Sequence, residues 1–133
     1  MDKCIYSKYC GGCSMQGISY PKQLEMKQEH ASNLLKKFGN VEEIIGCKHP
    51  TNYRNKVQVS FGYDDKRRLI CGNYVSSTHM IVPIKECMIV DERANELIDS
   101  VLRIATKYKI SAFDEYSYKG CLRHLLIRTS NLG

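Results

Sequence analysis

Residues 53–61 read YRNKVQVSF, and from Lys56 onward polar and apolar side chains alternate. Successive side chains of a β-strand point to opposite faces of a sheet, so this period of two predicts a strand with one buried and one wet face. The set expected in the core is Val57, Val59 and Phe61, and the set expected in water is Lys56, Gln58 and Ser60.

The segments downstream extend this strand into a sheet. A polar turn at 64–66 precedes an apolar run at 69–75, which predicts a hairpin; further strands are expected at 80–84 and 122–127. Asp91 can cap a helix between them. Its core-facing stripe is Ala94, Leu97, Ile98, Val101, Leu102, Ala105 and Tyr108. This pattern predicts an α/β fold of the α+β type: an antiparallel sheet with packed helices and an N-terminal cysteine-rich cluster loop.

Upstream, residues 21–38 predict a helix of about five turns. Pro21 suits a first helical turn, where its missing N–H needs no partner, and Gly39 ends the pattern. Residues 41–45 are either a short strand or a linker. The apolar stripe of the helix consists of Leu24, Ala31, Leu34, Leu35 and Phe38.

Length and composition indicate one domain in the cytoplasm. The chain has 133 residues, of which 43% are apolar, enough for one core. No run approaches the ~18 apolar residues of a membrane span, and no signal peptide is visible, so no membrane partner is expected. The net charge of +6 favours a polyanion such as nucleic acid, although a solvated basic surface carries the same charge.

Cysteine carries the strongest chemical signal. Seven cysteines, an odd number, without an export signal indicate reduced thiols rather than disulfides. Cys4, Cys10 and Cys13, with a remote Cys87, are typical of a soft-metal site and resemble the plant-type ferredoxin spacing with one extra residue in the first gap. Structural zinc is the main alternative; otherwise Cys10 and Cys13 are a reactive pair and the other two incidental. By default the remaining thiols are buried small residues: Cys47, Cys71 and Cys121.

Two polar clusters have the chemistry of nucleic-acid contacts, because guanidinium, ammonium, amide and aromatic groups contact phosphates and unpaired bases. A solvated strand face is the alternative. The residues are Tyr53, Arg54, Lys56 and Gln58 in the first cluster, and Arg123 and His124, with Arg128, in the second. No glycine-rich turn for S-adenosylmethionine or a dinucleotide is present, and no P-loop, so neither catalytic nor cofactor-binding residues are expected in this chain.

Taken together, these motifs resemble the RNA (uracil-5-)-methyltransferases. The resemblance starts at Cys4-x5-Cys10-Gly-Gly-Cys13 and Met15-Gln16, and continues through Tyr20-x2-Gln23-Leu24-x2-Lys27. It extends to YRNKVQ at 53–58, Cys87 and GCLRHL at 120–125, in the order of that family.

The resemblance implies that Cys4, Cys10, Cys13 and Cys87 hold a [4Fe–4S] cluster. It implies three parts: the iron–sulfur loop at 1–14, a helical segment at 15–44, and the central RNA-binding and iron–sulfur domain at 45–133, truncated at its C-terminus. The family methylates C5 of uracil in ribosomal or transfer RNA with S-adenosylmethionine, after a cysteine thiolate attacks C6 of a base taken out of its stack.

The family's catalytic cysteine, its base and its cofactor loop belong to a C-terminal domain that this sequence does not contain. The chain alone is therefore expected to be inactive. The family also implies that helix 21–38 packs on that missing domain, which leaves it free to form a dimer here. Because methylation needs no electron transfer, a clamping role for the cluster is expected. A zinc-stabilised nucleic-acid-binding module and a small iron–sulfur electron carrier are the alternative functions.

Overall fold

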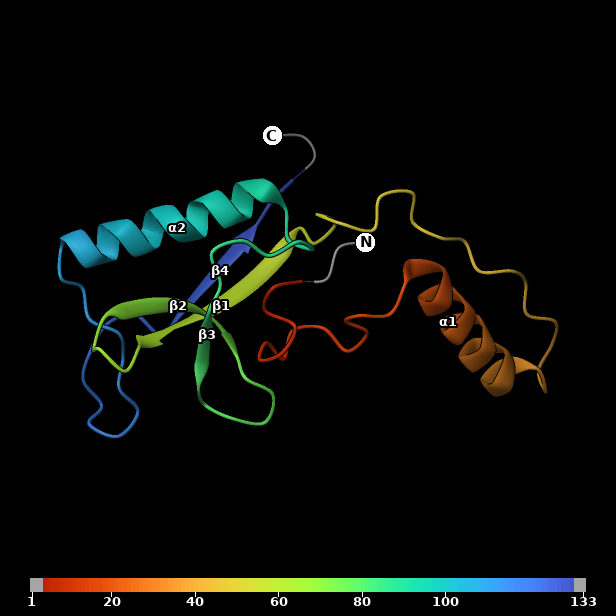
Figure 1. The fold of residues 1–133 in the computed structure, drawn as a ribbon, viewed down its shortest axis with the longest axis horizontal. Coiled ribbons are helices and arrows are strands. Elements are labelled where there is room, and N and C mark those ends of the chain that lie inside the picture. The colour runs from red at the N-terminus through yellow and green to blue at the C-terminus, as the bar shows by residue number, and fades with distance from the viewer. Residues whose placement is uncertain (1–3, 131–133) are drawn as a thin grey trace.

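The computed structural model describes residues 4–130, which form two helices and one four-stranded antiparallel sheet (Figure 1). In the sheet the strands lie in the order β3-β2-β1-β4. This confirms the α+β class. The bounds are α1 Tyr20–Leu35, β1 Lys56–Tyr63, β2 Leu69–Tyr74, β3 Ile81–Pro83, α2 Glu92–Lys107 and β4 His124–Arg128.

The predicted period of two places β1 at the centre of the core. Val59 and Phe61 are buried, and Phe61 lies opposite Cys71 of β2. On the other side Val57 pairs with Ile127 of β4. Because paired residues share a face of the sheet, these apolar side chains gather on one side, as the alternation predicts.

Ser60 departs from that pattern, and its predicted exposure was wrong. The alternation predicts a wet side chain, yet Ser60 is only 5% exposed. Its cross-strand partner is His124, whose Nδ1 lies 3.1 Å from the Ser60 hydroxyl. The imidazole therefore takes the place of water as the hydrogen-bond partner, and the serine is buried at no cost in unsatisfied polar groups.

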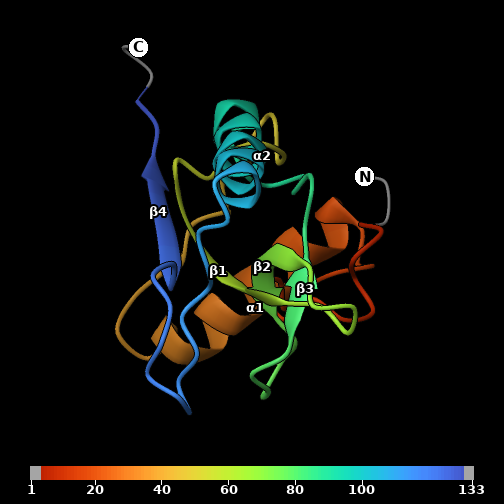
Figure 2. The same ribbon diagram turned by 90° about the vertical axis from the view of Figure 1, so that its left-hand side faces the viewer.

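The helix α2 lies on the apolar face of the sheet (Figure 2). Asp91 caps it as predicted, accepting a hydrogen bond from the Arg93 N–H at 3.0 Å. Ala94, Ile98 and Ala105 are buried, but two predicted members of the stripe are largely outside the core: Leu97 is 49% exposed and Tyr108 66%. Leu97 lies on the flank of the stripe and Tyr108 beyond the last helical turn, so the contact stripe is narrower than predicted.

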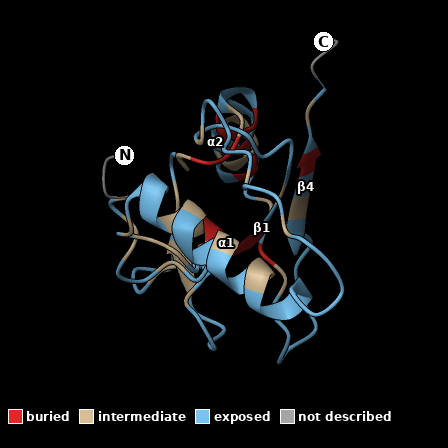
Figure 3. Cartoon of the chain, turned by 90° about the vertical axis from the view of Figure 1, so that its right-hand side faces the viewer, coloured by how far each residue is buried: buried red, intermediate tan, exposed pale blue. Residues whose placement is uncertain are grey.

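The predicted helix 21–38 is confirmed as α1, which ends at Leu35 and not at Phe38. It contains no buried residue and lies apart from α2 and the sheet (Figures 1 and 3). Residues 41–45 are a linker without regular structure. No helix within residues 4–130 is both long and apolar enough to cross a membrane.

Candidate functional site

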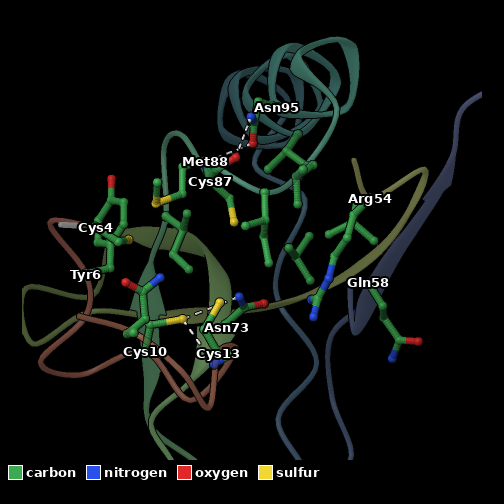
Figure 4. A pocket seen from close by; sticks show the side chains of 18 of the residues that line it. Cys4, Tyr6, Cys10, Cys13, Arg54, Gln58, Asn73, Cys87, Met88 and Asn95 are labelled. Atoms are coloured by element: carbon green, nitrogen blue, oxygen red, sulfur yellow. Dashed lines mark hydrogen bonds between the residues drawn. The ribbon is translucent and has the colours of Figure 1, made fainter. Parts of the chain in front are cut away.

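The four predicted metal ligands line a single cavity (Figure 4). Cys4, Cys10 and Cys13 come from the N-terminal loop, and Cys87 comes from the segment between β3 and α2. The cavity measures about 100 Å³, several times the ~10–15 Å³ that one buried water needs. The fold therefore brings together four thiols that lie up to 83 positions apart, around a space large enough for a group of several atoms.

Backbone hydrogen bonds fix the N-terminal loop against the β2–β3 hairpin. Cys10 forms an isolated antiparallel bridge with Val75, and the Gly11 N–H donates to the Tyr74 carbonyl at 3.1 Å. The Tyr6 hydroxyl accepts a hydrogen bond from the Lys85 N–H at 3.2 Å. These contacts hold one wall of the cavity in place.

Asn95 fixes the opposite wall. Its Oδ1 accepts from the Cys87 N–H at 3.1 Å, and its Nδ2 donates to the Cys87 carbonyl at 3.2 Å. The side chain is buried, with 9% exposure. Sequence reasoning missed this residue, although an amide inside the core-facing stripe of a helix, next to Ala94, was the available signal.

The sulfur atoms themselves accept hydrogen bonds. Cys10 Sγ accepts from the Gly12 N–H at 3.4 Å and from Asn73 Nδ2 at 3.6 Å. Burial raises the pKa of the Cys87 thiol, whereas hydrogen bonds from the backbone N–H groups of Ile89 and Val90 lower it. The nearby thiols of Cys13 and Cys4 also raise this pKa.

Such N–H···S donors stabilise the negative charge of a metal-bound thiolate, so the donor set fits a soft metal group. Within residues 4–130, however, no three Cys, His, Asp or Glu side chains are grouped closely enough to hold a metal ion. A metal centre in this cavity is therefore a proposal.

The other three cysteines divide into two kinds. Cys71 is buried in the core, as predicted, and burial raises the pKa of its thiol to about 12. Cys47 and Cys121 are exposed, so the prediction that they are buried was wrong. Both lie outside the helices and strands.

Three of the predicted nucleic-acid residues share one face of the sheet. Lys56 and Gln58 are exposed on β1, and His124 of β4 lies on the same face opposite Ser60. Arg128, which the sequence groups with Arg123 and His124, lies directly opposite Lys56. Two like charges placed across a strand pair repel each other, so this arrangement is unfavourable unless an anion binds there.

The remaining predicted residues lie elsewhere. Tyr53 and Arg54 come just before β1 and both are exposed; Arg54, like Lys56 and Gln58, lines the cysteine cavity. Arg123 is turned away from Lys56 and Gln58. Its guanidinium binds Glu115 at 2.6 Å and lies 5.3 Å from the ring centre of Phe113. The structure thus brings Lys56, Gln58 and His124 together, but not Arg123.

Comparisons with known proteins point to one class of protein. No protein-family model matches the chain. It is 38% identical to an RNA methyltransferase of Clostridium tetani and 37% identical to one of Staphylococcus aureus strain COL, in each case over 95% of this chain. The chain spans about 28% of the first relative and 29% of the second.

A solved structure shares the fold. Pyrococcus abyssi tRNA (uracil-54, C5)-methyltransferase, in complex with S-adenosyl-L-homocysteine, superposes with a TM-score of 0.74 and 24% identity, over 92% of this chain and 29% of that one. Over nearly its whole length, the chain is therefore similar to one portion of the RNA methyltransferases, a class of longer proteins. This confirms the RNA-methyltransferase resemblance that the motifs indicated.

Proposed function

We propose that this chain is the iron–sulfur-cluster- and RNA-binding portion of an S-adenosylmethionine-dependent RNA (uracil-C5)-methyltransferase that acts on ribosomal or transfer RNA. The observation that carries the proposal is the convergence of Cys4, Cys10, Cys13 and Cys87 on one cavity, in a chain similar to RNA methyltransferases. The fold shared with a tRNA (uracil-54, C5)-methyltransferase supports uracil as the target and S-adenosylmethionine as the methyl donor.

We divide the chain into the iron–sulfur loop at 1–14, of which residues 1–3 lie outside the described part, the helical segment at 15–44, and the central domain at 45–133. Methyl transfer is assigned to the part of the parent protein that lies outside this chain, because the relatives are more than three times as long. We therefore expect no methyl transfer from S-adenosylmethionine to a uridine-containing RNA by this chain alone.

Size and chemistry favour a [4Fe–4S] cluster over zinc in the cysteine cavity. A space of about 100 Å³ takes a group of several atoms, and hydrogen bonds to sulfur are a means by which proteins tune iron–sulfur clusters. When bound, the cluster links four thiolates rigidly. The chain's own residues do the rest: Tyr6, Asn73 and Asn95 orient the segments that carry the sulfurs.

We assign RNA contact to Tyr53, Arg54, Lys56, Gln58, Arg123 and His124. The cross-strand pair of Lys56 and Arg128 supports this assignment, because two facing exposed cations attract an anion such as phosphate. Ser60 holds one ring nitrogen of His124 and so orients the imidazole on the same face. Arg123 reaches RNA only if its ion pair with Glu115 opens.

Metal analysis of the chain, purified without oxygen, tests the proposal. We expect broad visible absorption and equal amounts of iron and acid-labile sulfide. Stoichiometric zinc without sulfide would indicate the zinc-stabilised nucleic-acid-binding module instead. An intact cluster with a reversible potential in the physiological range, but without affinity for RNA, would indicate an electron carrier.

We propose that the exposed side of α1 and the turn after it bind the methyltransferase domain of the parent protein. Without that domain, we propose that the same surface binds a second copy of the chain. Leu34, Leu35 and Phe38 are 57%, 50% and 77% exposed. Exposed apolar side chains gathered at one helix end are typical of a surface that binds a partner. Sedimentation at rising protein concentration tests the dimer, and a monomer at the highest concentration would contradict it.

A further inference from the structure

A second cavity lies beside the cysteine cavity, and its lining includes two of the residues assigned above to RNA contact, Tyr53 and Arg54. It is a groove of about 470 Å³ between the N-terminal loop, the start of α1 and the segment that leads into β1. We call it the loop groove. The lining residues on which the argument rests are Cys13, Tyr20, Gln23, Lys27, Tyr53 and Arg54.

Hydrogen bonds hold all three walls of the loop groove. Gln23 Nε2 donates to the Ile18 carbonyl at 2.9 Å and so ties α1 to the end of the N-terminal loop. The Tyr20 hydroxyl accepts from the Cys47 N–H, which ties α1 to the linker. The backbone N–H of Arg54 donates to the Ile89 carbonyl at 2.8 Å. The groove is therefore formed before any ligand arrives, which reduces the entropy that binding costs.

The charge of the loop groove is positive and not compensated. Its lining contains Lys27 and Arg54 and no Asp or Glu. Among residues 4–130 neither cationic side chain has an ion-pair or hydrogen-bond partner, although Lys22, on the same helix as Lys27, is paired with Glu25. Unpaired cations on a fixed backbone are ready to bind phosphate.

Tyr53 adds an aromatic surface. It is 57% exposed at the edge of the loop groove. An exposed ring beside two cations matches the pattern of single-strand binding, in which bases stack on aromatic rings and the backbone follows positive charge. A double helix needs a wide, open surface, so a groove of this size fits an unpaired strand.

The loop groove and the cysteine cavity share a wall. Both are lined by Gly12, Cys13, Gln16, Arg54 and Ile89. Any group bound by Cys13 therefore fixes the loop that forms one side of the groove. We infer that the loop groove binds an unpaired segment of the RNA, and that its affinity depends on whether the cysteine cavity is loaded; this rests on the proposed function.

The first test measures RNA affinity with a fluorescent oligouridylate of about ten nucleotides, a length within the range of known single-strand sites. Lys27→Glu should weaken binding about tenfold and reduce its dependence on salt, because one phosphate contact is lost. Tyr53→Ala should weaken it about fivefold or more, because a stacked base is lost. Both variants should keep the visible absorption of the cluster.

The matched control is Lys66→Glu, which makes the same change of charge in the exposed turn between β1 and β2, outside the loop groove. It should leave affinity within about twofold, since at moderate salt charges beyond a Debye length are screened. If Lys66→Glu weakens binding as much as Lys27→Glu, net charge alone explains the effect and the inference is overturned.

The second test compares loaded protein with protein whose cluster has been removed, in wild type and in Lys27→Glu. Loss of the cluster should weaken wild-type binding about as much as Lys27→Glu does, and the two changes together should add little. Independent, additive losses would overturn the coupling. Circular dichroism checks that the sheet and α2 stay folded.

Two other outcomes separate this inference from the proposed function. If wild type binds the oligouridylate and only Lys56→Glu weakens it, RNA lies on the β1–β4 face, the proposed function stands, and the loop groove is left for a protein segment. If loaded wild type does not bind RNA at all, both the inference and the RNA part of the proposed function are wrong.

Discussion

The two halves of the chain are held together by different forces. Residues 51–130 contain every buried side chain of the described part, including Phe61, Cys71 and Ile98, whereas none of residues 4–50 is buried (Figure 3). The second half folds around an apolar core in the ordinary way. The first half has only hydrogen bonds and partly covered side chains to hold it, among them the contact of Gln28 with the Ile44 N–H.

This contrast gives the cysteine cavity a physical purpose. A segment that buries little apolar area needs another source of stability, and small folds commonly use a metal for it. The cavity has three cysteines on the first half and Cys87 on the second. A bound metal group would add its binding free energy to folding at the place where the core does not reach.

The largest expected effect comes from Cys87→Ser. We expect the cluster and its visible absorption to be lost, because one of four ligands is removed. Hydrogen exchange should then become fast across residues 4–50 and stay slow in β1 and α2.

Cys47→Ser is the matched control, since Cys47 is exposed and does not line the cysteine cavity. It should leave the absorption and the exchange unchanged. Retention of the absorption in Cys87→Ser would contradict the ligand assignment.

A pair of apolar truncations tests the contrast directly. Phe61→Ala in the core should lower the free energy of unfolding by about 3–5 kcal/mol, because a buried aromatic side chain leaves a cavity. Leu34→Ala on α1, where the side chain is 57% exposed, should change it by less than about 0.5 kcal/mol.

Urea unfolding followed by circular dichroism measures both. A large loss of stability in Leu34→Ala would mean that α1 is covered in solution, for instance by a second copy of the chain.

Asn95→Ala should have a smaller effect that reaches both halves. It leaves the Cys87 N–H and carbonyl without their partner and should cost about 1–3 kcal/mol. Because Cys87 then loses its orientation, the cluster should also be lost faster under a chelator. The rate at which the visible absorption decays measures this. Asn95→Asp keeps one acceptor, so its decay rate should lie between those of the wild type and Asn95→Ala.

The sequence predicts the periodic elements of both halves, because a periodic pattern is a local signal. The alternation around Val59 reflects the buried face of a strand, and the capped stripe after Asp91 reflects the buried face of a helix. Each periodic pattern therefore predicts its element. Ser60 departs from the pattern because its partner, His124, is 64 positions away and becomes adjacent only through strand pairing. The local alternation of side chains does not predict which residues of two distant strands pair with each other.

The candidate site shows the same contrast between local signals and contacts of distant segments. The spacing of Cys4, Cys10 and Cys13 is a local signal, and it predicted the three loop members of the cavity. The supporting residues Asn73 and Asn95 carry no such signal, because their role depends on which segments the fold brings together. The loop groove likewise arises from three segments that are distant in sequence, so it was not predicted.

The smallest expected effect concerns Asp91, at the junction between the start of β1 and α2. Its N–H donates to the Arg54 carbonyl at 3.1 Å, and its carboxylate binds the Arg93 guanidinium at 2.8 Å. The hydrogen bond from the Arg93 side chain holds the pKa of Asp91 well below its ordinary value. A lowered pKa stabilises the fold above the unfolded pKa of about 3.9, and this contribution is lost as pH falls toward the folded pKa.

Asp91→Asn keeps a good helix cap and removes the charge. On acidification from about pH 5 to pH 2, the wild type should therefore lose slightly more stability than the variant, with α2 and the sheet affected alike. The difference should be small because the carboxylate is in contact with water and its attraction to Arg93 is screened. Urea unfolding at several pH values measures it. Equal pH slopes would mean that the ion pair with Arg93 does not persist in solution.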